Sequence, residues 1–416
     1  MNQEATLAVT TESTAKQTAV RVFGALCLAH LVVDGLATLL PASLGLIEIR
    51  SQLTPEQAAW LLGLGSLTSG LAQPLCALFS DRLRTRSLTV VGILLGGIGF
   101  GLLGFARNQI SLSLIYILGM VGAGMFHPIA ATTVAQLHAN LRNLAAGGFF
   151  VAGMIGGVGG ALLWPRWLAG ESGFDRLPLI VLPCVLIALF VRSSHERLPS
   201  LKHQAPKPMD ASSLGKNWGA VCILYGSSIL RHSVNTSLVY LFVRWTQQVV
   251  ASEHSHWSPA EIARAAAPTV GNLNAMMILG MAVGGMLAGS LISPGREKLP
   301  MIIVPLVFAP SVVLFPYLGI GWSYLLAVLA GAGFSAMIPV SIALAQHLLP
   351  HRANLAASLM MGGAGMVASV GPRCAEYGVT HFGFHATFLL VAIVLACSGL
   401  VCIALCGTKI TCNQDA

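Results

Sequence analysis

Ionisable side chains interrupt three separate apolar runs of this 416-residue chain. A charge near the centre of a lipid bilayer is costly, so such residues usually face a polar cavity or a partner. Their positions in separate runs therefore indicate a water-filled or proton-conducting path through a helix bundle, which is typical of a transporter. The residues concerned are His30, Asp34, His127, Arg231 and His232.

Asp34 follows His30 by four residues, so both side chains project from one face of a helix. In a low-dielectric cavity a carboxylate and an imidazole have proton affinities that respond strongly to their surroundings. This is the property that a proton-coupled carrier requires, and we expect the pair to carry the coupled proton. The alternative is a structural pair that hydrogen-bonds two helices.

Arg231 supplies a fixed positive charge, because a guanidinium does not deprotonate in proteins. It could attract an anionic substrate, or it could neutralise Asp34 across the cavity until Asp34 is protonated. Both roles stay open, and they could alternate in one cycle. His232 projects from another part of the same helix and is the weaker candidate for contact with a substrate.

His127 and Pro128 lie in the middle of another apolar run. Proline removes a backbone donor and kinks a helix, which frees a carbonyl that a cavity can use. We expect His127 to be a substrate ligand or proton relay beside a hinge at Pro128. The alternative is a packed histidine that is bonded to a neighbouring helix.

The elements that must position these residues are membrane-spanning helices. Hydrophobic residues make up 55% of the chain and charged residues only 9%, whereas soluble domains carry about a quarter charged residues. The length allows roughly a dozen spans of about 20 residues. The net charge of +8 comes from basic residues in the connections, as the positive-inside rule explains without nucleic acid. We expect a lipid bilayer, not nucleic acid, as the chain's surroundings.

Twelve apolar runs follow one another, six on each side of a hydrophilic linker. They fall at about 21–47, 57–79, 88–106, 111–138, 144–166, 177–193, 217–245, 268–292, 299–317, 321–349, 353–377 and 384–407. The predicted fold is an all-α membrane protein with twelve transmembrane helices in two six-helix repeats. The predicted parts are a disordered cytoplasmic tail, a first bundle, a cytoplasmic linker, a second bundle and a second cytoplasmic tail: 1–20, 21–193, 194–216, 217–407 and 408–416.

The two halves also resemble each other in sequence. The stretches 122–146 and 331–357 share Gly-Ala-Gly, Ala-Gln and Asn-Leu-Ala-Ala in the same order. Parallel six-helix repeats with a substrate site at their interface characterise one class of secondary transporters; chance similarity of Gly/Ala-rich helices is the alternative. Basic residues concentrate in alternate connections, which predicts that both termini and the central linker lie in the cytoplasm.

The connection from Ala77 to Arg86 resembles the signature of the major facilitator superfamily between its second and third helices. Asp81, Arg82 and the trailing Arg86 match it, although Ala77 and Arg84 replace its glycines. The resemblance covers residues 21–407 and implies that Asp81, Arg82 and Arg86 act as a cytoplasmic latch in gating. A simple basic loop that sets topology is the alternative.

Within that superfamily the chain resembles the fosmidomycin-resistance type of drug exporter. The patches that carry this narrower resemblance are His30 to Asp34 with Leu40-Pro41, Gly122 to Pro128, Arg231 and Gln73-Pro74. Ile129 stands where the family has an acidic residue. The resemblance implies proton coupling by Asp34 and His30. It implies substrate contact by four residues: His127, Arg231, His232 and Gln73.

Small residues four apart let helices approach closely. Gly153 and Gly157 form such a pair, and we expect them, like Pro128, to take part in gating as well as packing. His254 and His256 in the loop 247–268 are better explained by a solvated loop than by a metal site. No metal or other cofactor is expected.

The predicted function is proton-coupled efflux, an antiport of a small organic compound or drug by alternating access. The proton gradient would be the energy source, because the chain has no Gly-Lys-Ser/Thr pattern for ATP. We expect a monomer that is not an enzyme and whose partners are a small-molecule substrate, protons and lipid. The alternatives are a proton-coupled importer of a small metabolite, and a non-transporting sensor or a channel with the same fold.

Overall fold

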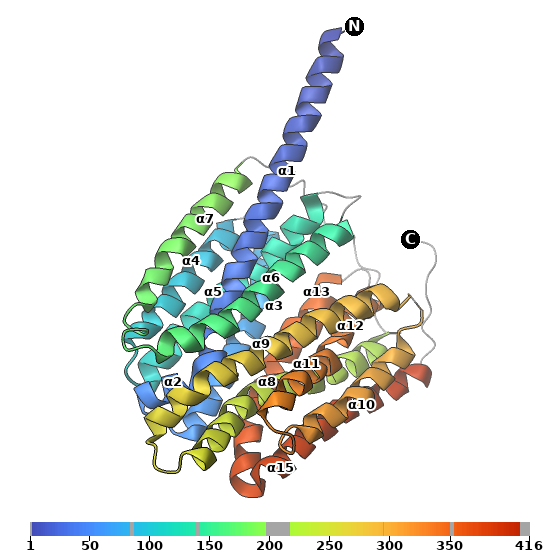
Figure 1. Cartoon of the computed structure of the whole chain (residues 1–416). Helices are drawn as coiled ribbons and strands as arrows, with labels where there is room; N and C mark the ends of the chain where they lie inside the picture. The colour runs from blue at the N-terminus through green and yellow to red at the C-terminus, as the bar shows by residue number, and fades with distance from the viewer. Residues whose placement is uncertain are drawn as a thin grey trace.

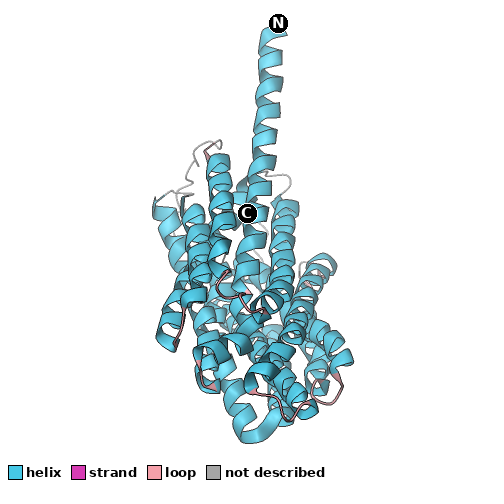
Figure 2. Ribbon diagram, turned by 60° about the vertical axis from the view of Figure 1, so that its left-hand side comes forward, coloured by secondary structure: helices cyan, strands magenta, loops and turns pink. Residues whose placement is uncertain are grey.

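A computed structural model describes residues 2–83, 87–137, 142–196, 217–293, 295–349 and 353–407. All secondary structure within these ranges is helical, as Figures 1 and 2 show. The prediction of an all-α fold is confirmed. Arg86, residues 197–216 of the linker and the tail 408–416 lie outside the described residues, as do the side chains of Asp81 and Arg82.

The first half contains one helix or helix pair for each predicted run. The elements are α1 (Asn2–Ala37), α2 (Leu39–Ser51), α3 (Pro55–Leu83), α4 (Ser87–Leu102), α5 (Gln109–Leu137), α6 (Arg142–Ala169) and α7 (Val181–His195). The first run divides at Thr38 because Pro41 has no backbone N–H to continue the bonding of α1. The Thr38 hydroxyl instead donates to the Gly35 carbonyl at 2.8 Å. Asp34 thus lies one turn before this break.

The second half is less regular. Its α-helices are α8 (Trp218–Glu253), α9 (Pro259–Leu291), α10 (Lys298–Leu314), α11 (Ile320–Ser335), α12 (Met337–Leu348), α13 (Ala353–Ser358), α14 (Ala364–Val367) and α15 (Gly371–Leu400). A π-turn at Leu359–Gly363 and a 3₁₀ turn at Ala368–Val370 interrupt the eleventh run. Within α15, Gly383 has a φ of 77°, which glycine adopts without steric cost. This residue separates the eleventh run from the twelfth.

The stretch from Met1 to Gln17, which we expected to be disordered, is helical from Asn2 onward. Helix α1 begins at Asn2 and projects well beyond the bundle in Figure 1. The physical reason lies in the composition, because residues 2–20 contain no proline or glycine and include several strong helix formers. The helix therefore extends back from the first span without interruption.

Eight helical segments of the described chain are long and apolar enough to cross a membrane, and the last of them, Leu355–Leu405, includes two of the predicted runs. Helix α8 is not among the eight. Its middle carries Ser227, Ser228, Arg231, His232 and Ser233, which lower its hydropathy. A helix of this length with a polar middle is suited to line a cavity between other helices.

The two halves pack through a limited set of helices. Helices α2 and α6 contact α9, and α3 contacts α14 and α15. Helix α3 also contacts the π-turn Leu359–Gly363, and there the backbones almost touch, since a Cβ atom at Gly70 would lie 2.6 Å from the Gly362 carbonyl oxygen. The interface therefore depends on glycine at points where two helices meet.

One end of the bundle has well-described turns. We call it the distal end, because it lies opposite the N-terminus in Figure 1. It contains the connections 52–54, 170–176 and 254–258. At the other end, α3, α5 and α12 end at Leu83, Leu137 and Leu348.

Candidate functional site

Asp34 lies between two histidines in the first half. Its Oδ1 atom is 2.8 Å from Nε2 of His127 on α5, and its Oδ2 atom is 3.2 Å from Nε2 of His30 on α1. The side chains of Asp34 and His127 are 18% and 28% exposed, whereas that of His30 is 6% exposed. We call these three residues the His–Asp–His cluster. Sequence reasoning grouped His30 with Asp34, and the fold adds His127 to them.

The outer nitrogen of each imidazole is held by a backbone carbonyl. Nδ1 of His30 donates to the Phe149 carbonyl at 2.7 Å, and Nδ1 of His127 donates to the Ala123 carbonyl at 2.6 Å. A carbonyl oxygen only accepts hydrogen bonds, so both Nδ1 atoms carry hydrogen. Each Nε2 atom is therefore aimed at Asp34 as the exchangeable position of its ring.

The geometry allows the protons of the cluster to be counted. Each of the two Nε2–carboxylate contacts needs one proton to be a hydrogen bond. With both protons present the cluster carries a single net positive charge, from two imidazoliums and one carboxylate. Removing one proton leaves the cluster neutral and leaves one of the two contacts without its hydrogen.

Helix α6 closes the far side of the cluster. The Phe149 ring stacks on the His30 ring with centroids 4.0 Å apart. A Cβ atom at Gly153 would lie 2.5 Å from both Asp34 Oδ2 and His30 Nε2. Gly153 was expected to contribute to gating, and the structure places it in direct contact with the cluster. Only a residue without a side chain leaves room there for the His30–Asp34 pair.

The other predicted gating residues have different surroundings. A Cβ atom at Gly157 would meet Ile278 of α9 at 3.5 Å, so this glycine faces the second half of the molecule. Helix α5 continues through Pro128. Asp81 and Arg82 lie in the last turn of α3.

Arg231 lies in the second half, fully buried at 0% exposure. Its Nη2 atom donates to the hydroxyls of Ser341 and Ser228, at 2.6 and 3.2 Å. Its Nε and Nη1 atoms have no hydrogen-bond partner in the described part of the chain. A buried guanidinium is thus surrounded here by hydroxyl groups instead of a carboxylate.

The ion pair between Arg231 and Asp34, one of the two roles that the sequence left open for Arg231, is absent from this conformation. Asp34 instead forms its contacts with the two histidines, and Arg231 forms its own with the two serines. The reason is that His127 and His30 already approach both carboxylate oxygens. A mechanism in which protonation releases Asp34 from Arg231 therefore does not describe this conformation.

The hydrogen bonds of His232 and Gln73 do not involve the His–Asp–His cluster. Nδ1 of His232 donates to the Ser228 carbonyl at 2.8 Å, one turn earlier on α8. Gln73 is half-buried on α3, donates weakly to Ser69 at 3.4 Å and packs near Gly362 of the second half. The structure therefore places Gln73 at the contact between the halves.

Two ion pairs that the sequence analysis missed join the halves at the distal end. Arg244 on α8 grips Glu48 on α2 in a fork, with Nη1–Oε2 and Nη2–Oε1 distances of 2.8 and 3.0 Å. The two side chains are only 14% and 10% exposed, and Arg244 also donates to the Tyr240 hydroxyl at 2.9 Å. Each member lies at the edge of an apolar run, which was the signal available in the sequence.

The second of these ion pairs is more exposed. Arg373 on α15 lies 2.8 Å from Glu56 on α3, and it also contacts Glu376 one turn further along its own helix. The Glu56 side chain is 55% exposed. Two ion pairs of different burial therefore hold the halves together at the distal end.

The His–Asp–His cluster also has the donor types of a metal site, because its ligand atoms lie within 4.8 Å of one another. Both Nε2 atoms are at hydrogen-bond distance from Asp34, which a proton satisfies. Zinc would need bonds of about 2.0–2.2 Å to the same atoms. We interpret the cluster as a proton site, and the absence of a cofactor stays a prediction.

Comparison with known proteins places this geometry in context. The profile described as Major Facilitator Superfamily matches residues 22–260 and 236–409. The fosmidomycin resistance protein of Escherichia coli (strain K12) is 23% identical over 383 residues, which cover 92% of each chain. An uncharacterized MFS-type transporter of Bacillus subtilis (strain 168) is 20% identical over 372 residues, 88% of each chain.

Solved structures with the same fold have low sequence identity. A bacterial homologue of the human lysosomal transporter Spinster, solved in an inward-facing and occupied conformation, has a TM-score of 0.67 at 15% identity, covering 93% of this chain and 96% of that one. A D-xylose–proton symporter has a TM-score of 0.67 at 16% identity, covering 92% and 96%. At 15–16% sequence identity, these similarities show that the fold is shared.

Proposed function

Because this chain belongs to the major facilitator superfamily, we propose that it is a secondary active transporter that exports a small organic compound or drug in exchange for protons. Members of the superfamily are multi-pass membrane transporters, not enzymes. The observation that carries the proposal is the position of Asp34 between two histidines, each fixed by a backbone carbonyl. The cluster can gain or lose a proton while its heavy atoms stay in place.

Proton movement would change the packing between helices. The Asp34–His127 hydrogen bond joins α1 to α5, and the His30–Phe149 bond joins α1 to α6. Loss of one proton leaves one of the Asp34 contacts without hydrogen and weakens that tie. Since Asp34 and His127 are partly exposed, protons can reach them from water. Protonation thereby alters how firmly the helices of the first half are held.

Arg231 is proposed to bind the substrate in another conformation of the cycle. A fully buried guanidinium with no carboxylate partner in the described chain favours an approaching negative group. Its planar fork suits a carboxylate or a phosphonate, which it can grip at two points. We therefore propose an anionic group on the transported compound. The Escherichia coli relative is named as a fosmidomycin resistance protein. That name supports efflux as the direction of transport.

The distal ion pairs are proposed to close the outer side of the transporter. By the distribution of basic residues, both termini lie in the cytoplasm of a bacterial cell, and the distal end faces the outside of its inner membrane. Glu48–Arg244 and Glu56–Arg373 then hold this conformation shut toward the outside. Export requires both to break and a cytoplasmic closure, to which Asp81, Arg82 and Arg86 are assigned, to form. We propose that one monomer carries out this cycle.

The proposal is tested with purified protein in liposomes. Ligands are first found by thermal shift, and each hit is then measured in counterflow and under an imposed pH gradient. We expect saturable counterflow. Under the pH gradient, we expect substrate to cross the membrane in the direction opposite to the protons. Accumulation in the same direction as protons would establish the importer instead, and flux that does not saturate would establish a channel.

A further inference from the structure

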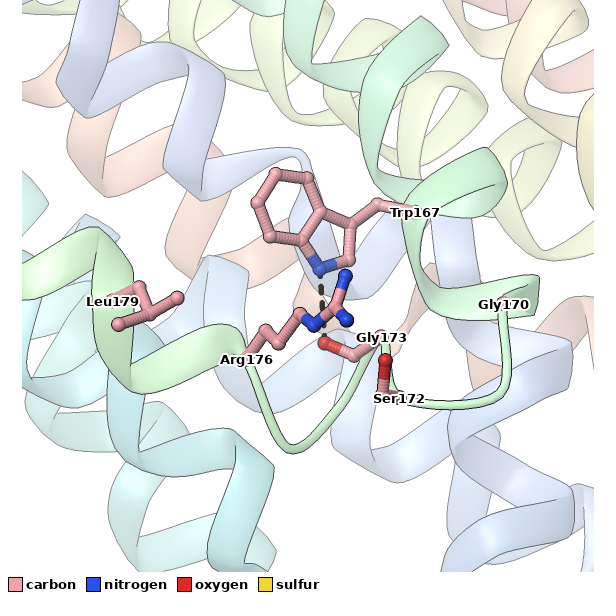
Figure 3. A pocket seen from close by; sticks show the side chains of 6 residues that line it. All are labelled: Trp167, Gly170, Ser172, Gly173, Arg176 and Leu179. Atoms are coloured by element: carbon pink, nitrogen blue, oxygen red, sulfur yellow. Dashed lines mark hydrogen bonds between the residues drawn. The ribbon is translucent and has the colours of Figure 1, made fainter.

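A surface groove of about 490 Å³ lies at the connection between α6 and α7, at the distal end. Figure 3 shows the residues that line it, from the last turn of α6 through the connecting loop. They are Trp167, Gly170, Ser172, Gly173, Arg176 and Leu179. No residue of the His–Asp–His cluster lines this groove. The proposed transport mechanism therefore does not explain why the groove is there.

The loop around the groove is held in one shape. The Trp167 indole N–H donates to the Gly173 carbonyl at 2.9 Å, as the dashed line in Figure 3 shows. A Cβ atom at Gly173 would collide with the Trp167 carbonyl oxygen, so the tight turn requires glycine. The groove is therefore a formed feature of the loop, with the indole as one wall.

Arg176 provides a positive charge that forms no ion pair in the described chain. The residue is exposed, and its hydrogen bonds among the described residues are made by its backbone alone. The neighbouring Asp175 contacts Arg50 instead, at 3.3 Å. Glu171, the other acidic residue of the loop, does not line the groove. The lining thus contains one cation without an ion-pair partner, Arg176, and one hydroxyl group, from Ser172.

Apolar side chains continue from the groove along the outer surface of the 3₁₀ turn Leu177–Ile180 and of α7, which follows it. Leu179, Leu182 and Leu186 are 65%, 65% and 59% exposed, and their spacing of three to four residues puts them on one face. On the α6 side, Leu163 is exposed one turn before Trp167. A cationic and aromatic rim above a leucine-lined surface is the arrangement found where a protein meets lipid headgroups and acyl chains.

We propose that this groove binds an anionic phospholipid. The lipid phosphate lies against Arg176 and the Ser172 hydroxyl, and an acyl chain follows the leucines of α7 toward the bilayer centre. Charge complementarity selects an anionic headgroup over a zwitterionic one, because the Arg176 guanidinium is paired with neither Asp175 nor Glu171 of its own loop, and Asp175 contacts Arg50 instead. The site is independent of the substrate and of the proton coupling proposed above.

The experiment compares phosphatidylglycerol with phosphatidylcholine of the same acyl chains. Lipids are added to the full-length protein in detergent, and the bound molecules are counted by native mass spectrometry. We expect preferential retention of phosphatidylglycerol by the wild type. Arg176→Gln should lower the ratio of the two lipids bound by about fivefold, the contribution expected from one basic residue near a headgroup. Arg176→Lys should restore most of it.

Arg264→Gln is the matched control, because Arg264 is also an exposed arginine near the distal end but does not line the groove. It should leave the ratio unchanged. Equal retention of both lipids by the wild type, or an unchanged ratio in Arg176→Gln, would overturn the proposal. Displacement of bound lipid by soluble glycerol 3-phosphate at equal concentration would show a site for free phosphate and would overturn it as well.

Discussion

Helices α1 and α8 open the two halves of the molecule, and each carries an ionisable residue in its middle, but the surroundings of the two residues differ. Asp34 on α1 lies between two imidazoles that can exchange protons with it. Arg231 on α8 lies among serine hydroxyls that cannot. The first half thus holds a charge that can change, and the second half holds one that cannot. The helices that open the two halves therefore carry ionisable residues whose neighbours give them different chemistry.

Exposure reinforces this difference. Asp34 and His127 are partly exposed, so water and protons can reach the cluster, whereas Arg231 is fully buried. Burying an ion costs several kcal/mol unless an opposite charge or several good hydrogen bonds offset it. Two hydroxyls offset only part of this for Arg231. A conformation in which Arg231 meets an anionic ligand would therefore gain stability, and no such gain is available to Asp34.

The largest effect is expected from Asp34→Asn, which keeps the side chain's shape but removes the charge that both histidines share. Proton-driven transport should fall to the level of empty liposomes, while the protein still folds and binds ligand. The measurement is substrate flux under an imposed pH gradient. Asp175→Asn, an exposed acid at the distal end, is the control and should transport normally. Full proton-driven flux in Asp34→Asn would remove the cluster from the coupling mechanism.

The next largest effect is expected at the distal ion pairs. Arg244→Gln leaves Glu48 buried without its partner, and breaking a buried pair in this way costs about 3–5 kcal/mol. Glu56→Gln breaks the more exposed pair, worth about 0–1 kcal/mol. A spin-label distance between the halves at the distal end should therefore lengthen in Arg244→Gln and change little in Glu56→Gln. Equal populations of the open state in both variants would contradict the assignment of Glu48–Arg244 as the main outer closure.

Arg231 is the third test, and it separates charge from geometry. Arg231→Ala should weaken binding of an anionic ligand by about 2 kcal/mol, since hydrogen bonds to charged groups contribute about 1.5–3 kcal/mol. Arg231→Lys should retain expression yet lose most affinity, because an ammonium lacks the planar fork. Isothermal titration with a confirmed ligand measures both. Wild-type affinity in Arg231→Lys would refute two-point recognition.

The absence of an Arg231–Asp34 contact sharpens this third test. If the two residues are not paired, each substitution lowers the free energy of unfolding independently. The loss in the double variant should then equal the sum of the losses in Asp34→Asn and Arg231→Ala, within about 0.5 kcal/mol. A double variant that is more stable than Arg231→Ala alone would show that the two charges do interact.

The smallest effect is expected at the glycines of α6. In Gly153→Ala the new methyl group must displace the His30–Asp34 pair, so proton-driven flux should fall several-fold, with a stability loss of about 1–3 kcal/mol. Gly157→Ala is the matched comparison, since its methyl group would only reach ordinary contact with Ile278. Flux assays and thermal unfolding measure both. Equal defects in the two variants would point to helix packing in general instead of to the cluster.

Much of the fold could be predicted from the sequence, because apolar runs of span length have few alternatives to helix in a bilayer. The grouping of His30 with Asp34 followed from helical spacing alone. The approach of His127 depends on how α5 packs against α1, which spacing within one helix does not encode. For the same reason the sequence left open a pair between Arg231 and Asp34, whereas in the structure each has other partners. The Glu48–Arg244 pair was detectable as charges at the edges of apolar runs.

The most direct test of the central claim is to measure protons as ligand binds. Detergent-solubilised protein in weak buffer with a pH-indicator dye is mixed with a confirmed ligand, and the released protons are counted. The His–Asp–His cluster predicts release by the wild type and none by Asp34→Asn, with ligand binding retained in both. Equal release by the two proteins would show that the coupled proton resides elsewhere and would contradict the account.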